Sequence, residues 1–393
     1  MTEYEILLAL KTSDPLKGLP NVRLANLVVQ PKVKQGRFDA KFDLQYGDTK
    51  VEVYVEVKNT CTPKQVEQIA PWLSQMKAMK TGTAFALVCP SLSPQSQRVC
   101  LDKNVDFIDL AGNIFINVPG KLLLQRVGMQ PRQETSPSYY RNPFSGKSSR
   151  ILRVLLQKPG TWTLSAIIEE LATETKRSKC ADASFEVSFS LASRVLRSLE
   201  EELLVRRSPT PFDSEQVVPA RSPEEGISVA RGSPILVPEL KRLLTVWGKE
   251  YKDRYRWYLR RSFKVPNPFG PSLKEVRQAL DGLLKPRCYA FTGAAAASIT
   301  APFVDIDPIE LYISDEAGAE NLKASIARGS LGPDLRIIYA FDSGVFMYSS
   351  LKDGIPVVSD IQVYLDLFAR GGRDLKQADY LLQSRIEPMW GNR

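Results

Sequence analysis

The chain has no histidine among its 393 residues. This absence excludes Ser-His-Asp and Cys-His nucleophile systems, histidine-ligated metal nucleases and most zinc sites. Proton transfer must therefore use lysine, a carboxylate, tyrosine or metal-bound water. The chain also lacks an apolar run of the roughly 18 residues that a membrane helix needs. The acidic start at residues 1–5 lacks the basic region of a signal peptide, so we expect no membrane partner.

Cysteine is scarce and scattered. The five cysteines lie far apart, and none forms a Cys-x-x-Cys pair: Cys61, Cys89, Cys100, Cys180 and Cys288. This spacing is typical of reduced thiols and not of a disulfide framework. We therefore expect a cytoplasmic protein.

Positive charge is in excess and unevenly placed. The formal net charge is +9, and residues 141–265 hold 23 Lys and Arg against 15 Asp and Glu. Nearly all of the surplus thus lies in the middle third of the chain. Concentrated positive charge is typical of a surface that binds polyanions, although a solvated basic surface gives the same composition.

The length predicts two to four domains. A polar segment with two prolines at residues 130–138 has the composition of a linker. Three prolines at residues 263–271 predict a second break without regular structure. We expect a multi-domain α/β chain with domains at residues 1–128, 140–240 and 241–393.

A β-hairpin is predicted near residue 47. The segments on either side of Gly47-Asp48 alternate with a period of two, as half-buried strands do. One face of the second strand carries valines (Val51, Val53, Val55, Val57), and the other carries Glu52, Tyr54, Glu56 and Lys58. A two-residue turn pairs Tyr46 with Thr49 and places Asp39 opposite Glu56.

Such a register predicts a metal site. Directly opposed residues have Cβ atoms about 4.5–5.5 Å apart, and two carboxylates that close repel unless a cation lies between them. Mg²⁺ is held by one or two carboxylates together with water and phosphate oxygens. Lys58, on the same face, could orient or deprotonate a water or stabilise charge on the phosphate. The register also pairs Asp43 with Glu52, so an exposed acidic face is an alternative, and a four-residue turn would change the register.

Helices and strands are predicted to alternate after the hairpin. Helices are expected at residues 63–80, interrupted or bent near Pro71, and at 94–103. Strands are expected at residues 83–89, 105–108 and 114–116. Asp39 and Glu56-Val57-Lys58, with Gln65 or Gln68 on the next helix and Glu3 or Glu5 on the first, resemble the PD-(D/E)xK nuclease superfamily. Phe38 stands where that pattern has proline.

This resemblance covers roughly residues 1–125 and implies a restriction-endonuclease-like fold. It implies that Asp39 and Glu56 bind Mg²⁺ or Mn²⁺, and that Lys58 assists hydrolysis of a phosphodiester in DNA.

The middle third predicts a winged helix-turn-helix. Helices are expected at residues 148–157, 164–171, with Thr163 as N-cap, and 188–204. A strand at 205–207 and a return near 229–232 would form the wing. The third helix and the strand present the candidate DNA-binding residues Ser190, Ser193, Arg194, Arg197, Arg206 and Arg207. A three-helix packing domain with solvated arginines is the alternative, and the polar insert at 173–185 is unusually long for such a turn.

Residues 247–264 interleave seven basic residues with six aromatic ones. The aromatic side chains could stack on bases, or they could form a buried stripe, because Trp247, Tyr251, Tyr255 and Tyr258 recur at helical spacing.

The last third predicts an α+β domain. Thr292-Gly293, an alanine run and Asp305-Ile306-Asp307 resemble a nucleotidyltransferase turn and metal pair. Ala294 replaces the serine of that turn and Pro308 follows the second aspartate, so a degenerate, non-catalytic site is expected. Thr292-Gly293, the strand 309–313, residues 358–367 and Gly371-Gly372-Arg373-Asp374 resemble the AbiEi-type antitoxins of type IV toxin–antitoxin systems. That resemblance spans about residues 145–385 and implies an N-terminal winged helix, repression of an operon and a cognate toxin.

Three hypotheses follow. The chain is a metal-dependent DNA endonuclease targeted to double-stranded DNA by its winged helix. Alternatively, it is a non-catalytic DNA-binding transcriptional regulator or antitoxin that retains a nuclease-like fold. A third possibility is an interaction scaffold whose basic surface meets an acidic partner. The sequence does not indicate an oligomeric state.

Overall fold

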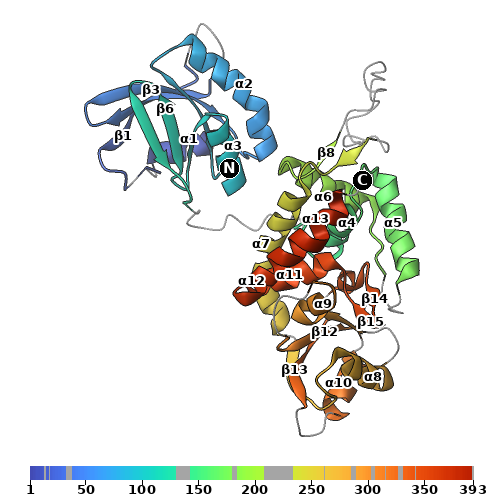
Figure 1. Ribbon diagram of the computed structural model, residues 1–393. Coiled ribbons are helices and arrows are strands. Elements are labelled where there is room, and N and C mark those ends of the chain that lie inside the picture. Colours follow the sequence, from blue (N-terminus) through green and yellow to red (C-terminus); the bar gives the residue numbers. More distant parts are fainter. Residues whose placement is uncertain are drawn as a thin grey trace. The chain divides into compact units, whose positions relative to one another are not determined.

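A computed structural model describes the chain (Figure 1). It describes all residues apart from 13–14, 17, 32–37, 130–141, 179–183, 208–232, 261, 285–288, 302–305, 315, 326–330, 341 and 392–393. The expected linker at 130–138 and wing strand at 229–232 lie outside the described residues. No helix in the described part of the chain has the length and apolar character that a bilayer crossing requires.

The chain is a multi-domain α/β protein with mixed sheets. Its contacts divide it into two compact units, Met1–Tyr140 with Glu200–Leu203, and Arg141–Leu199 with Leu204–Arg393. Apart from Tyr140 and Glu200–Leu203, the second unit holds both segments predicted as domains at 140–240 and 241–393. The three-domain division stays a prediction.

The first unit is built on a seven-stranded sheet in the order β1-β2-β3-β4-β5-β6-β7. Strands β3, β4 and β5 are parallel, and the other neighbours are antiparallel. The strands are β1 (Val22–Val29), β2 (Ala40–Tyr46), β3 (Thr49–Val57), β4 (Ala84–Cys89), β5 (Asp106–Asp109), β6 (Ile114–Val118) and β7 (Leu122–Arg126). The predicted strands are present, whereas β1 and β7 at the two edges were not predicted.

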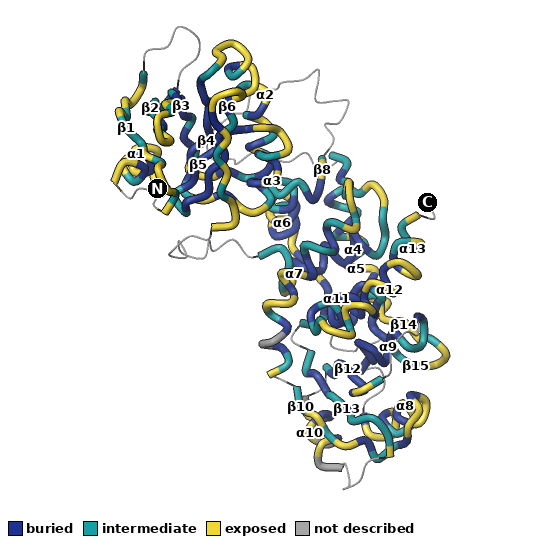
Figure 2. Tube along the Cα trace, turned by 60° about the vertical axis from the view of Figure 1, so that its left-hand side comes forward, coloured by how far each residue is buried: buried dark blue, intermediate teal, exposed yellow. Residues whose placement is uncertain are grey.

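Helices cover both faces of this sheet. Helix α1 (Glu3–Thr12) packs on one face, against the valine side of β3. Helices α2 (Pro63–Met79) and α3 (Pro94–Asp102) lie in the two parallel crossovers and cover the other face. In Figure 2 the central strands are largely buried, and the outer side of α2 is exposed. Helix α2 is not interrupted at Pro71, because Ala70, Leu73 and Met76 are buried around it and hold the helix against the sheet.

The second unit begins with the three predicted helices, α4 (Gly146–Gln157), α5 (Leu164–Arg177) and α6 (Phe189–Glu201). Helix α5 runs six residues past the predicted end at residue 171, so part of the expected polar insert is helical. Strands β8 (Arg206–Arg207) and β9 (Ile235–Leu236) pair antiparallel, and Trp162 forms a bridge to Ile235. The return strand in the described residues is therefore at 235–236.

A second sheet follows, in the order β10-β13-β12-β11-β15-β14. Its strands are β10 (Ser262–Asn267), β11 (Tyr289–Thr292), β12 (Ile309–Ile313), β13 (Gly332–Tyr339), β14 (Ser350–Lys352) and β15 (Ile355–Val357). The remaining helices are α7 (Leu240–Leu259), α8 (Leu273–Leu283), α9 (Gly293–Thr300), α10 (Glu316–Ser325), η2 (Ser343–Phe346), α11 (Asp360–Arg370), α12 (Arg373–Leu381), η3 (Leu382–Ile386) and α13 (Glu387–Gly391).

The prediction of a segment without regular structure at residues 263–271 was wrong for residues 263–267, which belong to a strand. Strand β10 includes Pro266 and pairs with β13, and the register shifts between Val265 and Asn267. A proline is tolerated there because β10 is an edge strand and the irregularity falls at the residue that lacks an N–H donor.

Thr163 caps helix α5 as predicted. Its hydroxyl accepts a hydrogen bond from the Ala166 N–H at 3.2 Å. We expect Thr163→Ala to lower the free energy of unfolding by about 1 kcal/mol, because one N–H of the first turn loses its acceptor. Urea unfolding followed by circular dichroism measures this. The exposed Thr173 in the same helix offers a control, since Thr173→Ala should change stability much less.

Candidate functional site

The hairpin forms in the predicted register. Strands β2 and β3 pair from Tyr46–Thr49 to Ala40–Val55, with Gly47 in the turn at a φ of 56°. Beyond the last pair, the Asp39 N–H donates to the Val55 carbonyl at 3.0 Å. The Asp39 carboxylate accepts a hydrogen bond from the Val57 N–H at 2.7 Å. Asp39 therefore lies beside the end of β3 that carries Glu56 and Lys58.

The second acidic pair is neutralised by lysines. Asp43 contacts Lys50 at 2.9 Å, and Glu52 contacts Lys41 at 3.1 Å and Lys80 at 2.5 Å. A hydrogen bond from Asn26, then Lys50, lowers the pKa of Asp43. This pair is therefore part of a partly exposed ion network in which each carboxylate has a lysine partner. In the Asp39–Glu56 pair only Glu56 has one, Lys58.

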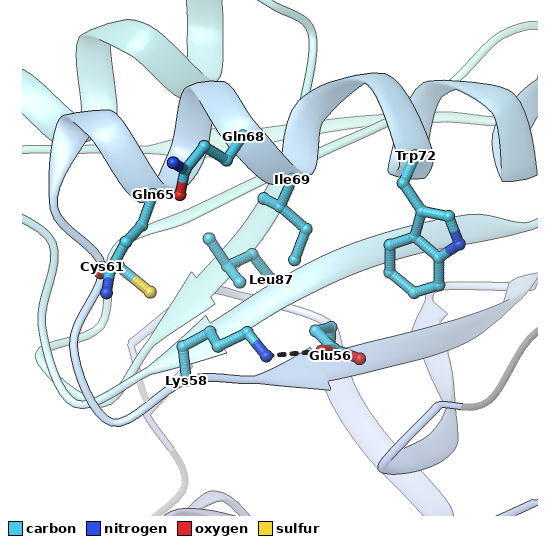
Figure 3. A pocket seen from close by; sticks show the side chains of 8 residues that line it. All are labelled: Glu56, Lys58, Cys61, Gln65, Gln68, Ile69, Trp72 and Leu87. Carbon is cyan, nitrogen blue, oxygen red and sulfur yellow. Dashed lines mark hydrogen bonds and ion pairs between the residues drawn. The ribbon is translucent and has the colours of Figure 1, made fainter. Parts of the chain in front are cut away.

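Lys58 forms an ion pair with Glu56. The Nζ lies 2.6 Å from Glu56 Oε1 (Figure 3), and the two side chains are 41% and 18% exposed. Burial works to lower the pKa of Lys58, but the hydrogen bond and charge of Glu56 and the charges of Asp39 and Glu3 outweigh it, so this pKa is raised. Lys58 is thus a cation at neutral pH, which favours charge stabilisation over proton abstraction.

The two candidate acidic residues of α1, Glu3 and Glu5, interact with different groups in the structure. The charge of Glu3 acts on Lys58. The Glu5 carboxylate instead accepts a hydrogen bond from the Thr2 N–H at 2.7 Å, at the start of the helix. Glu3 is therefore the residue of α1 that contributes to the electrostatics of this site.

A cavity of about 520 Å³ opens beside this ion pair. It is lined by Glu56, Lys58, Cys61, Gln65, Gln68, Ile69, Trp72 and Leu87. Figure 3 shows Ile69 and Trp72 on α2 pointing toward the strand that carries Glu56 and Lys58, while the Gln68 side chain runs along the helix toward Gln65. Gln65 closes a capping box with Thr62, whereas the side chain of Gln68 makes no hydrogen bond to any described residue. Gln68 is thus the glutamine with a side chain available to a ligand.

Trp72 was not predicted as a site residue. It stacks on Phe38 with ring centroids 5.0 Å apart, and Phe38 is fully buried. The residue that departs from the nuclease pattern therefore packs the wall of the cavity. Helical spacing with Gln65, Gln68 and Ile69 was the signal that could have placed Trp72 on this face.

Asp39 and Glu56 fit a divalent cation of the Mg²⁺ type. One oxygen of each accepts a bond within the unit, and the other, Oδ1 of Asp39 or Oε2 of Glu56, has no partner among the described residues. Two carboxylates suit Mg²⁺ completed by water and phosphate oxygens. No group of three His, Cys, Asp or Glu side chains in the described part of the chain could hold a metal, so an all-protein site is not formed there.

The candidate DNA-binding residues lie on α6 and β8. Ser190, Arg194, Arg197 and Arg206 are exposed, and Ser193 and Arg207 are partly buried. The Nε and Nη2 atoms of Arg207 are buried from solvent. The opposite face of α6 packs inward through Leu191, Val195, Leu196 and Leu199. Helix α6 therefore presents a polar, basic face as the sequence predicts.

The aromatic stripe of α7 is part of the core. Trp247, Tyr251, Tyr255 and Tyr258 are all less than 9% exposed. Arg153 lies over the Trp247 ring at 5.2 Å. These four side chains are thus unavailable to stack on bases, and the buried-stripe interpretation holds.

The nucleotidyltransferase-like turn is filled by an ion cluster. Gly293 has a φ of 58°, and a Cβ there would collide with the Glu310 carboxylate. Glu310 is fully buried and pairs through one oxygen with Arg336 and through the other with Arg370. Both oxygens are occupied by guanidinium groups and none remains for a metal. Asp305 lies outside the described residues.

No family model and no curated protein matches the chain. Among solved structures, the chain is similar to one described as "Structure of EndoMS in apo form", with 17% sequence identity and a TM-score of 0.20. The match covers 28% of this chain and 46% of that chain, so it spans less than half of that chain's length. Because this similarity is low, it carries no argument about function.

Proposed function

We propose that the first unit hydrolyses phosphodiester bonds in double-stranded DNA with Mg²⁺ or Mn²⁺, and that α6 and β8 act as a winged helix that targets it. The observations that support the proposal are the Asp39–Val57 hydrogen bond and the Lys58–Glu56 ion pair, both at one end of β3, and the cavity that Glu56 and Lys58 line.

Each residue has a role that follows from its contacts. Asp39 and Glu56 would hold the cation through their unpaired oxygens. The bound cation would supply Lewis-acid polarisation of the phosphate and a water of lowered pKa. Lys58, kept protonated by Glu56, stabilises negative charge that develops on the phosphate. Gln68 and Trp72 line the space that the DNA backbone would enter.

Plasmid nicking tests this proposal. The full chain should convert supercoiled plasmid to open circles with Mg²⁺ or Mn²⁺, EDTA should stop it, and Glu56→Gln should remove it. The matched control is Glu52→Gln on the same face of β3, which should keep activity because Glu52 is paired with Lys41 and Lys80. If the wild type cuts neither plasmid nor linear duplex with either metal, the proposal is wrong.

A DNA-binding regulator or AbiEi-like antitoxin without catalysis is the second candidate. It is favoured by the Lys58–Glu56 ion pair, which neutralises the charge of a proposed metal ligand, and by the two arginines that pair with Glu310. In this case a cognate toxin would be a further partner. Salt-dependent duplex binding with no cleavage under any metal would support it.

Both candidates require DNA binding by α6. We expect Arg194→Ala/Arg197→Ala to weaken duplex binding at least about 10-fold and to reduce the slope of log affinity against log salt by about 1 to 2, because each arginine that contacts a phosphate releases a counterion. Fluorescence anisotropy across a salt series measures both quantities. Lys376→Ala, an exposed cation on α12, should leave both unchanged. An unaltered slope in the double variant would remove α6 from the DNA interface.

A further inference from the structure

A second cavity lies within the second unit. Its volume is about 690 Å³, inside the roughly 300–1,000 Å³ range of small-molecule sites. Its walls come from the ends of α4 and α5, from α8 and β11, and from the segment between η2 and β15. The cavity is therefore shared by the predicted DNA-binding helices and the C-terminal sheet.

One wall of this cavity is aromatic. Tyr289, Phe346 and Tyr348 line it, with Leu351 and Pro356. Tyr348 has a φ of 59°, which is uncommon for a bulky residue. It is held there by two carboxylates: its N–H donates to Glu174 at 2.8 Å, and its hydroxyl donates to Glu170 at 3.1 Å. Residues kept in such conformations concentrate at ligand sites, and this one presents a ring to the cavity.

Two arginines provide positive charge at the same cavity. Asp281 accepts hydrogen bonds from the Tyr289 hydroxyl and from Arg277 Nε, both at 2.7 Å. These bonds orient Arg277 and leave its two Nη groups outside that ion pair. Arg177 is exposed and forms no ion pair with any described residue. Both guanidinium groups can therefore contact an anion, which arginine binds with paired N–H donors.

The remaining polar groups of the cavity are held by the protein itself. Its lining includes the carboxylates of Glu174 and Asp281, which contact Tyr348 and Tyr289 respectively, and the Gln157 side chain, whose Oε1 atom is buried away from solvent. The cavity thus offers an aromatic wall and two cationic groups.

We propose that this cavity binds a nucleoside monophosphate, with its phosphate on Arg177 and Arg277 and its base against the tyrosine rings. Bases stack favourably on aromatic side chains. The site differs from the nucleotidyltransferase-like turn, because it lies at the Tyr289 end of β11 whereas that turn follows Thr292 at the other end. It does not depend on cleavage by the first unit.

Isothermal titration calorimetry of the full chain with AMP, GMP, CMP and UMP tests this proposal. At least one nucleotide should bind, and its nucleoside and inorganic phosphate should each bind at least about 10-fold more weakly, because each lacks one half of the contacts. Arg177→Ala should weaken binding of that nucleotide at least about 10-fold. Arg177 is exposed, and circular dichroism checks that the variant folds.

The control variant is Lys376→Ala, an exposed cation of α12 outside the cavity, which should leave the affinity unchanged. The proposal is overturned if none of the four nucleotides binds, or if phosphate alone binds as tightly as the nucleotide. It is also overturned if binding survives Arg177→Ala or is lost in Lys376→Ala, since either result would place the nucleotide elsewhere.

Discussion

Lys58→Met is expected to lower the rate of DNA cleavage by about 10²- to 10³-fold, the usual cost of removing one group that stabilises transition-state charge. The same change should strengthen Mn²⁺ binding. Lys58 Nζ lies 2.6 Å from Glu56 Oε1, so the ammonium group competes with a cation for the negative charge of the Glu56 carboxylate. Methionine keeps most of the side-chain length and removes the charge, so both effects report the loss of the ammonium group.

Initial nicking rates at saturating Mg²⁺ measure the first effect, and titration calorimetry with Mn²⁺ measures the second. Lys50→Met is the matched control, because Lys50 lies on the same strand and pairs with Asp43 at 2.9 Å. It should change neither quantity. If Lys58→Met cuts DNA at the wild-type rate, Lys58 has no part in the chemistry, and if it loses Mn²⁺ binding, Lys58 supports the ligands and does not compete with the metal.

The hairpin could be predicted because residues close together in the sequence determine its faces and its register. Alternation with a period of two assigned the faces of β3, and Gly47-Asp48 set the register that brings Asp39 beside β3. Strand β1 lacked such a signal. Its residues are at most half-buried, and its register shifts between Ala25 and Val28, so the strand depends on its partner β2 for its pairing and carries no clear alternation of its own.

The side-chain partners could not be predicted from the sequence. The register predicts two opposed acidic pairs, Asp39–Glu56 and Asp43–Glu52, and does not tell which of them could bind a cation. The three-dimensional fold brings Lys80, which follows α2, to Glu52. The pairing of Glu310 with Arg336 and Arg370 also joins three elements that are separated in the chain. Contacts between distant elements decide which acidic residues remain available for a cation.

Asp366 on α11 provides the second large effect, in the stability of the second unit. Its buried carboxylate accepts four hydrogen bonds: from the hydroxyls of Tyr251, Tyr312 and Thr292 at 2.7, 2.9 and 2.5 Å, and from Gln362 Nε2 at 2.8 Å. Burial raises the pKa of Asp366 to about 6, although these bonds oppose the shift, and the charge of Glu310 adds to it. The carboxylate therefore links α7, β11 and β12 to α11 through hydrogen bonds, although burying its charge removes it from water, which is unfavourable.

The sign of the pH dependence follows from this shift. The ordinary pKa of an aspartate, near 3.8, applies to the unfolded chain. Between that pH and about 6 the folded state binds the proton more tightly, so the contribution of Asp366 to stability falls as pH rises through this window. The loss is about 3 kcal/mol, at roughly 1.36 kcal/mol for each pKa unit. Asp366→Asn does not titrate, and its free energy of unfolding should lack this decline.

Urea unfolding from pH 4 to pH 7 measures the difference between wild type and Asp366→Asn. We expect the wild type to lose about 2 kcal/mol of the full effect relative to the variant over this range, whatever the offset that the amide introduces, because only the change with pH reports the titration. Asp353→Asn, at an exposed aspartate, should leave the wild-type profile unchanged. A difference that stays constant with pH would mean that Asp366 is ionised throughout, and that its four hydrogen-bond donors outweigh the cost of burying its charge.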